Sequence, residues 1–457
     1  MEKNCKLINI VLILFSLVGC NSNSSMSSSN NSTSSSISSS KEELLPIKIE
    51  KGTKGSISIL VDKGSKEAYQ EVLSLYNEYA ESNIYFKISE REEETYNDFK
   101  DFPDIYSFNS LEYHQLGYSR LFESNNEELK EYLKGLYSED LYSLSLKNES
   151  IVAVPYSFNT NVLYYNKKLV SNEEVKSFEG LSKAAKRVSN DTKQVKSTTF
   201  VDNNMHYFAT TFLAKKYDDA STSLVLKDTN SSLCGDDVIS TTKWMNEYYL
   251  NENGYKRPSS DGFEFDMLVD SNGVSNVLSI VAPATKNYQE KMEAILGDDL
   301  GVASLPSFNI NEDYGSVNKD TKFQSGTFAD VKYYGINAYM DIKDRKIPII
   351  ESVIAFLVSN KTQELLYEKG GVLPCYDGAE LIERSNNISK AQMEMKKYST
   401  LYPVTSSFYI RFEENDYLGV FYETLVFNKN VSTYEEIKNA LKKAEDYLNT
   451  GKTPSFN

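Results

Sequence analysis

Apolar strands alternate with helical segments in the first part of the chain. The predicted strands are residues 57–61, 84–89 and 104–109. Between the first two strands, apolar residues recur at the spacing of a helix from Tyr69 to Tyr79, and a charged helical stretch precedes the third strand. This alternation is the pattern of a parallel sheet with crossover helices, and it predicts an α/β fold.

Polar and aromatic residues follow two of these strands. Asp62 and Lys63 come directly after the first strand, and Phe108 and Asn109 end the third. Parallel sheets bind ligands at the carboxyl ends of their strands, so we expect these four side chains to share one edge of the sheet.

Residues 151–170 have the pattern of a strand that is interrupted once and then resumes. The apolar run 151–154 ends at Pro155, a polar and aromatic segment covers 156–161, and a second apolar run begins at Val162. Two interpretations are open. The chain either passes from one sheet to another, with the interruption facing a ligand, or makes an ordinary loop between two strands of one sheet.

Length and charge limit the class of protein. The 457 residues exceed the size at which one hydrophobic core usually keeps growing, so two lobes are expected. The formal net charge is −16. An acidic surface repels phosphate backbones and anionic lipids, which argues against a nucleic-acid partner and favours a neutral or cationic ligand over a phosphate.

The N-terminus has the pattern of a signal peptide. Lysines precede the continuous apolar segment 7–18, which is too short to span a bilayer. Gly19 and Cys20 follow at once and resemble the lipobox of bacterial lipoproteins, which implies that the cysteine is acylated. We expect a lipoprotein signal peptide at 1–19 and a lipidated, Ser- and Asn-rich tether at 20–45. The alternative is a short anchor with an incidental cysteine.

The sequence carries no catalytic motif, and its only histidines are His114 and His206. Neither histidines nor cysteines have metal-ligand spacing, so no metal and no cofactor are predicted. Cys234 and Cys375 remain after signal removal and are expected as free thiols, although export permits a disulfide. Any two of the 65 Asp and Glu residues could form a glycosidase pair, so a polysaccharide-processing enzyme is an alternative to a binding protein.

Short motifs follow one another in a fixed order along the chain. They are Asp62-Lys63-Gly64, Pro103-Asp104-Ile105, Val154-Pro155 with Leu163-Tyr164-Tyr165-Asn166-Lys167, Gly301-Val302-Ala303 with Leu305-Pro306, Tyr334-Gly335-Ile336-Asn337-Ala338, and Gly371-Val372-Leu373-Pro374. With this order and its lipobox, the chain resembles the family 1 extracellular solute-binding proteins over roughly residues 55–450. These are the maltose-binding-protein-like receptors of ABC importers.

The resemblance implies a periplasmic-binding-protein type II fold. Two α/β lobes, each a mixed and mostly parallel sheet flanked by helices, would be joined by crossing hinge strands. Lobe 1 would comprise residues 46–157 and about 334–376, and lobe 2 residues 158–333 and about 377–457.

Three segments would then carry the chain between the lobes. They lie near 156–161, near 328–334 and after Pro374. Ligand binding would be linked to hinge closure, because the ligand touches both lobes only in the closed form.

The resemblance also implies a ligand site. Asp62 and Lys63 match a pair that hydrogen-bonds sugar hydroxyls, and Phe108 matches an aromatic stacking position. Sugars present hydroxyl groups to polar side chains and CH faces to aromatic rings, which suits these residue types. The expected ligand-binding residues are Asp62, Lys63, Phe108, Tyr156, Asn159, Tyr207, Thr327, Tyr409 and Phe412.

Two positions depart from the family pattern. Leu111-Glu112 stands where the maltose receptors of the family have an acid–base pair, and Ala284 stands where they have a stacking Trp. These departures argue against maltodextrin itself and leave a carbohydrate of another kind as the expected ligand.

The expected function is that of a monomeric, lipid-anchored extracellular receptor of an ABC importer. It would bind a sugar or oligosaccharide between its lobes, deliver it to membrane permease subunits, and catalyse no reaction. It would lie on the outer face of the cell membrane and reach the membrane only through its lipid anchor. The alternatives are the same fold binding a peptide, polyamine or sugar phosphate, and a surface antigen or adhesin that has kept the fold.

Overall fold

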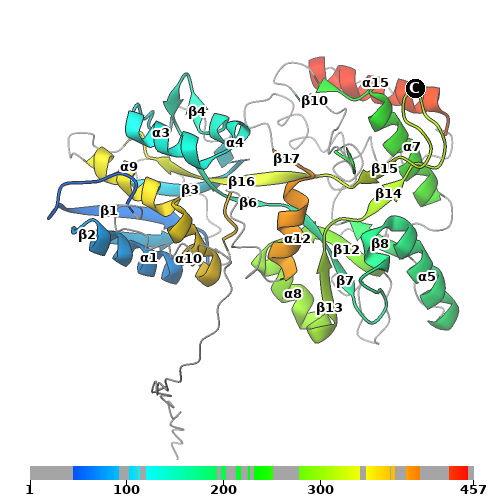
Figure 1. Cartoon of the computed structure of the whole chain (residues 1–457), viewed down its shortest axis with the longest axis horizontal. Helices are drawn as coiled ribbons and strands as arrows, with labels where there is room; N and C mark the ends of the chain where they lie inside the picture. Colours follow the sequence, from blue (N-terminus) through cyan, green and yellow to red (C-terminus); the bar gives the residue numbers. More distant parts are fainter. Residues whose placement is uncertain are drawn as a thin grey trace, which may run out of the picture. The chain divides into compact units, whose positions relative to one another are not determined.

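The computed structural model describes residues 45–91, 102–110, 112–113, 120–192, 197–201, 213–217, 225–226, 231–250, 277–339, 346–370, 372–375, 387–401 and 432–450. All of them belong to one compact unit, Lys41–Asn457, in which helices flank two main sheets (Figure 1). No helix within these ranges has the length and apolar character needed to cross a membrane.

The first sheet has six strands in the order β17-β16-β3-β1-β2, with β6 paired to β16. Their bounds are β1 (Lys54–Val61), β2 (Asn83–Glu90), β3 (Ile105–Asn109), β6 (Val154–Asn159), β16 (Thr327–Ile336) and β17 (Ser399–Leu401). β1 is parallel to β2 and β3, whereas β16 is antiparallel to β3 and β6. The three strands predicted from the alternation are confirmed as β1, β2 and β3, and the sheet is mixed.

Helices pack on this sheet through apolar faces. They are α1 (Lys66–Tyr79), α3 (Glu127–Leu136), α4 (Glu139–Ser143), α9 (Lys346–Leu357) and α10 (Asn360–Gly370). In α1, the predicted residues Tyr69, Val72, Leu73 and Tyr76 are buried, which leaves the polar face to solvent. Figure 1 shows α1 and α10 beside each other, below the strands.

The second main sheet has the order β13-β7-β12-β8. Its strands are β7 (Asn161–Asn166), β8 (Ser197–Val201), β12 (Val277–Pro283) and β13 (Leu300–Ala303). Its neighbour is a three-stranded sheet of β14 (Ser307–Asn309), β15 (Lys322–Gln324) and β9 (Lys215–Lys216). Two-residue strands also pair, β4 (Leu146–Lys147) with β5 (Ser150–Ile151) and β10 (Val225–Leu226) with β11 (Ser231–Ser232).

Five α-helices of the described chain accompany the second sheet. They are α5 (Phe178–Thr192), α7 (Asp236–Leu250), α8 (Lys286–Leu296), α12 (Asn387–Lys396) and α15 (Tyr434–Thr450), with short 3-10 turns at η4 (Glu174–Lys176) and η6 (Gly297–Asp299). α7 and α15 pack against each other, and α12 lies against β13 and β7 (Figure 1).

Buried apolar side chains form two separate clusters. One surrounds the first sheet and includes Ile59 and Tyr334. The other surrounds the second sheet and includes Leu163 and Phe308. Each sheet therefore has its own hydrophobic core, and the fold is a two-lobed α/β fold, as predicted.

The interrupted strand crosses between the two sheets. β6 pairs with β16 of the first sheet, Thr160 follows, and β7 pairs with β12 and β13 of the second. The sheet-to-sheet interpretation is therefore confirmed over the ordinary loop.

The predicted position of the interruption was wrong. Pro155 lies inside β6 and does not end a strand, because the break comes at Thr160. The register of β6 against β16 shifts between Lys332 and Tyr333, so Tyr156 is the additional residue of a bulge beside Pro155. A proline is tolerated at such a bulge, since its missing N–H is not needed for a regular ladder.

Candidate functional site

A cavity of about 250 Å³ lies where elements of the two sheets meet. The first sheet contributes the residues after β1 and parts of β6 and β16, and the second contributes the end of β12 and α12. Its lining is Asp62, Lys63, Gly64, Ser65, Ser157, Phe158, Asn159, Ala284, Thr285, Lys332, Gly370, Val372, Leu373 and Gln392. The cavity thus opens at the carboxyl end of β1, where a ligand site was predicted.

Asp62 is held in its ionised form by its neighbours. Its Oδ2 accepts hydrogen bonds from Lys332 Nζ at 2.5 Å and from the Tyr156 hydroxyl at 3.3 Å. Burial raises the pKa of Asp62, but the Lys332 ammonium and the more distant Arg91 charge outweigh it, so the pKa lies below its usual value. Oδ1 accepts no hydrogen bond from any residue that the structure describes, and a ligand can approach it.

Lys63 is an exposed residue at the mouth of the same cavity. Its ammonium group has no partner within the described part of the chain, so its three donors are available to a ligand.

Asn159 ends β6 and is bridged to the second sheet. Gln392 of α12 donates from Nε2 to Asn159 Oδ1 at 2.8 Å and to the Ala284 carbonyl at 3.2 Å. Gln392 is buried, so this bridge fixes the amide of Asn159 with Oδ1 occupied and the NH₂ group as the end left for a ligand.

Tyr156 was predicted to present its ring to a ligand, but the ring does not line the cavity. The side chain is 2% exposed, and its ring stacks on Tyr334 with centroids 4.0 Å apart. Its hydroxyl shares a hydrogen bond of 2.8 Å with Ser107 Oγ and reaches Asp62. Because Tyr156 is the bulge residue, its side chain turns into the core, where it orients Asp62.

Two further expected contact residues are also buried. Phe108 is 2% exposed, stacks on Tyr333 with centroids 5.5 Å apart, and does not line the cavity. Thr327 is fully buried, and its hydroxyl accepts from the Asn161 N–H at 3.4 Å and donates to the Phe328 carbonyl at 3.0 Å. In this structure both stabilise the sheets, and neither offers a ligand-binding surface.

Several sequence predictions lie outside the described residues. They concern Cys20, Leu111, His114, His206, Tyr207, Tyr409 and Phe412. Cys234 and Cys375 are described, and both are free thiols, as expected.

Lys332 and Gln392 are site residues that the sequence reasoning missed. They lie 270 positions from Asp62 and 233 positions from Asn159, respectively. The alternation of polar and apolar residues from Asp330 to Tyr333 indicates which face of the strand Lys332 occupies, but not that Asp62 lies opposite.

Asp330 is a half-buried carboxyl on β16, directly opposite Asn159. Its Oδ1 accepts from the Ser110 N–H at 3.2 Å. Burial raises the pKa of Asp330 to about 6, although the Ser110 hydrogen bonds and the Lys332 charge act in the opposite direction. Because the pKa of Asp330 is higher in the folded state than in the unfolded state, the protein loses stability as the pH rises from 3.8, the ordinary pKa of this group, to about 6.

We therefore expect Asp330→Asn to stabilise the protein at pH 7 by about 1–3 kcal/mol and to have a much smaller effect at pH 4. The amide keeps the shape and the acceptor for Ser110 but carries no charge to desolvate. Melting temperatures at both pH values measure the effect. An equal gain at the two pH values would show that packing, and not ionisation, is responsible.

The family model of the bacterial extracellular solute-binding proteins matches residues 98–397. No curated protein sequence matches the chain.

Solved structures share the fold at low sequence identity. The ligand-free maltodextrin-binding protein of L. casei is 14% identical with a TM-score of 0.65, and the match covers 87% of this chain and 100% of that one. The maltose-binding periplasmic protein of Listeria monocytogenes in complex with maltose is 18% identical with a TM-score of 0.63, covering 88% and 99%. The cyclic α-maltosyl-1,6-maltose-binding protein of Arthrobacter globiformis is 12% identical with a TM-score of 0.61, covering 88% and 100%.

These structural matches establish the fold, and the family model, which spans well over half of the chain, establishes the family. The chain belongs to the bacterial extracellular solute-binding proteins.

Proposed function

We propose that this solute-binding protein is the lipid-anchored receptor of an ABC importer, and that it binds a sugar or oligosaccharide in the cavity between its two sheets. One observation carries the proposal. An ionised Asp62 faces the same cavity as Lys63 and the bridged amide of Asn159, and among the described residues neither Asp62 Oδ1 nor the Lys63 ammonium has a partner.

These groups suit a neutral solute with many hydroxyls. The free oxygen of Asp62 accepts from a sugar hydroxyl, while Lys63 and the NH₂ group of Asn159 donate to others. Lys332 already neutralises Asp62, so the charge that remains in the lining is that of the exposed Lys63. The similar structures named for binding maltose and maltodextrin support a carbohydrate as the solute.

The division into lobes remains the one expected from the sequence. We assign residues 46–157 and about 334–376 to lobe 1, and 158–333 and about 377–457 to lobe 2. The two core clusters support this division in outline, since the first contains side chains up to Phe158 and again from Ala329 to Cys375. The first core thus begins its second stretch a few residues before the assigned bound at about 334. The bridge from Gln392 to Asn159 then joins α12 of lobe 2 to the strand that crosses between the lobes.

The proposed location rests on the N-terminal pattern. The apolar segment and Cys20 support a location on the outer face of the cell membrane, with the protein held by its lipid and by the Ser- and Asn-rich tether. A monomer in this position would deliver its solute to the permease subunits.

A thermal-shift screen of the purified protein against a panel of mono- and oligosaccharides tests the function. At least one sugar is expected to raise the melting temperature, because a ligand that binds only the folded state stabilises it by mass action. Amino acids, peptides and polyamines serve as comparison ligands. A clear shift with one of these and none with any sugar would reject the carbohydrate assignment.

A further inference from the structure

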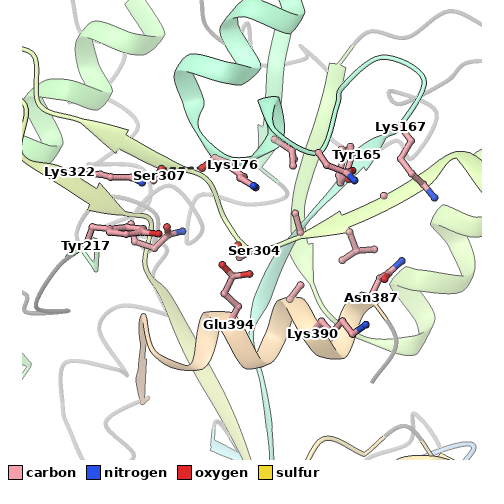
Figure 2. Close-up of a pocket in the computed structure, with 17 residues that line it drawn as sticks. Tyr165, Lys167, Lys176, Tyr217, Ser304, Ser307, Lys322, Asn387, Lys390 and Glu394 are labelled. Atoms are coloured by element: carbon pink, nitrogen blue, oxygen red, sulfur yellow. Dashed lines mark hydrogen bonds between the residues drawn. The ribbon is translucent and has the colours of Figure 1, made fainter. Parts of the chain in front are cut away.

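A second cavity, of about 660 Å³, lies entirely on elements of the second core (Figure 2). Its floor includes β13, where the ring of Tyr165 lies directly against Gly301. A Cβ atom at position 301 would come within 2.2 Å of that ring, so the close approach requires glycine. The volume falls within the range of about 300–1,000 Å³ that is typical of small-molecule sites. We refer to this cavity as the basic groove.

Four lysines line the basic groove, against a single glutamate. They are Lys167 after β7, Lys176 of η4, Lys322 of β15 and Lys390 of α12, and the glutamate is Glu394. This excess of positive charge occurs in a chain whose net charge is −16. A concave surface of one sign concentrates ions of the opposite sign.

Lys167 and Lys390 are the most available of the four. They lie at the right of the view in Figure 2, with Asn387, the first residue of α12. Both lysines are exposed, and neither ammonium has a partner within the described ranges. The unpaired N–H groups at the start of a helix add to the positive potential at this end.

The other two lysines are partly engaged. Lys176 pairs with the exposed Glu173 at 2.7 Å, an ion pair of the kind that contributes little and exchanges readily. The ammonium of Lys322 lies 3.7 Å from the centre of the Tyr217 ring. Tyr398 stacks on the same Tyr217 ring at 6.4 Å, so both neighbours compete for the faces that a sugar would need. The basic groove is thus better suited to an anion than to a neutral sugar.

The charge of the lining favours a ligand that carries more than one negative charge, because four lysines face a single glutamate. No arginine lines the basic groove within the described chain, so lysine ammonium groups would hold the anion. Lysine acts as a point charge and suits phosphate oxygens, which carry up to about two charges per group. We propose that the basic groove is a second binding site, separate from the solute cavity, for a small molecule that carries phosphate groups.

Calorimetric titration of the purified protein with inorganic tripolyphosphate tests the proposal. Saturable binding is expected, with an affinity that falls as the salt concentration rises. The double substitution Lys167→Gln and Lys390→Gln is expected to weaken binding about a hundredfold, since each lost charged hydrogen bond contributes about a factor of ten or more in favourable geometry. Both side chains are exposed, so the variant should keep the melting temperature of the parent protein.

Two controls separate a site from general electrostatics. Lys183→Gln with Lys186→Gln removes the same charge from exposed positions of α5 that do not line the groove, and it should change the affinity less than about twofold. A protein with Asp62→Ala and Asn159→Ala should bind tripolyphosphate normally, whatever becomes of solute binding.

The absence of saturable tripolyphosphate binding would overturn the proposal. Equal losses in the two lysine variants would do the same, because they would show a response to net charge alone. Binding to vesicles of anionic phospholipid without binding to tripolyphosphate would also overturn it, since the partner would then be a membrane surface.

Discussion

Loss of the sugar-induced thermal shift is the expected result when Asp62→Ala and Asn159→Ala are combined. The double substitution removes a charged acceptor and a fixed amide donor from the same cavity. Hydrogen bonds to charged groups contribute roughly 1.5–3 kcal/mol, so affinity should fall about a hundredfold or more. The measurement is the dissociation constant for the sugar that gives the largest shift in the screen.

The matching control replaces the same residue types outside the cavity. Asp298→Ala with Asn318→Ala changes two exposed side chains and should leave the affinity unaltered. Far-ultraviolet circular dichroism should show that both variants are folded. If the Asp62 and Asn159 variant still binds the sugar as tightly as the parent protein, the proposed site is misplaced.

Phe308→Ala is expected to cause the largest loss of stability. Phe308 is fully buried in the second core and stacks on Trp244, with ring centroids 4.1 Å apart. Removing a buried phenylalanine leaves a cavity and costs about 3–5 kcal/mol. Trp244 is the single tryptophan of the chain, so its fluorescence during denaturant unfolding reports on this core directly.

Two comparison variants show whether the effect comes from the cavity. Phe308→Leu retains most of the apolar volume and should cost about 1.5 kcal/mol or less. Tyr85→Ala removes an aromatic ring that is 68% exposed and should change stability by no more than about 0.5 kcal/mol. A loss below about 1 kcal/mol for Phe308→Ala would mean that the core can repack around the missing ring.

The elements of the first sheet were predictable because their signals are local. The apolar run 57–61 lies within β1, and the spacing from Tyr69 to Tyr79 matches the buried face of α1. A strand or helix with one buried face repeats its apolar residues at a fixed period, and this period can be read without knowledge of the partner element.

The crossing between the sheets was predictable in kind but not in position. Pro155 suggested the end of a strand, because proline cannot donate to a ladder. Pairing with β16 accommodates it beside the bulge at Tyr156 and moves the break to Thr160. Only the register between two strands, which are far apart in the sequence, decides this.

The residues of the candidate site were likewise predictable only in part. Asp62, Lys63 and Asn159 were identified from the sequence, and all three line the cavity. Phe108 and Tyr156 were expected beside them, yet both rings are buried. An aromatic residue at the end of a strand can face either the core or a ligand, and its residue type suits both environments.

By itself the sequence determined the class of fold, the need for two cores, and the strand end at which polar residues gather. Tertiary structure alone decided that Lys332 neutralises Asp62, that Gln392 orients Asn159, and that Tyr156 turns away from the cavity. The reason is physical. Periodicity and turn preferences act over a few neighbouring residues, whereas these contacts join side chains that are far apart in the sequence. Lys332 and Tyr156 reach their partners only when the strands of the first sheet pair, and Gln392 reaches Asn159 only when α12 packs against that sheet.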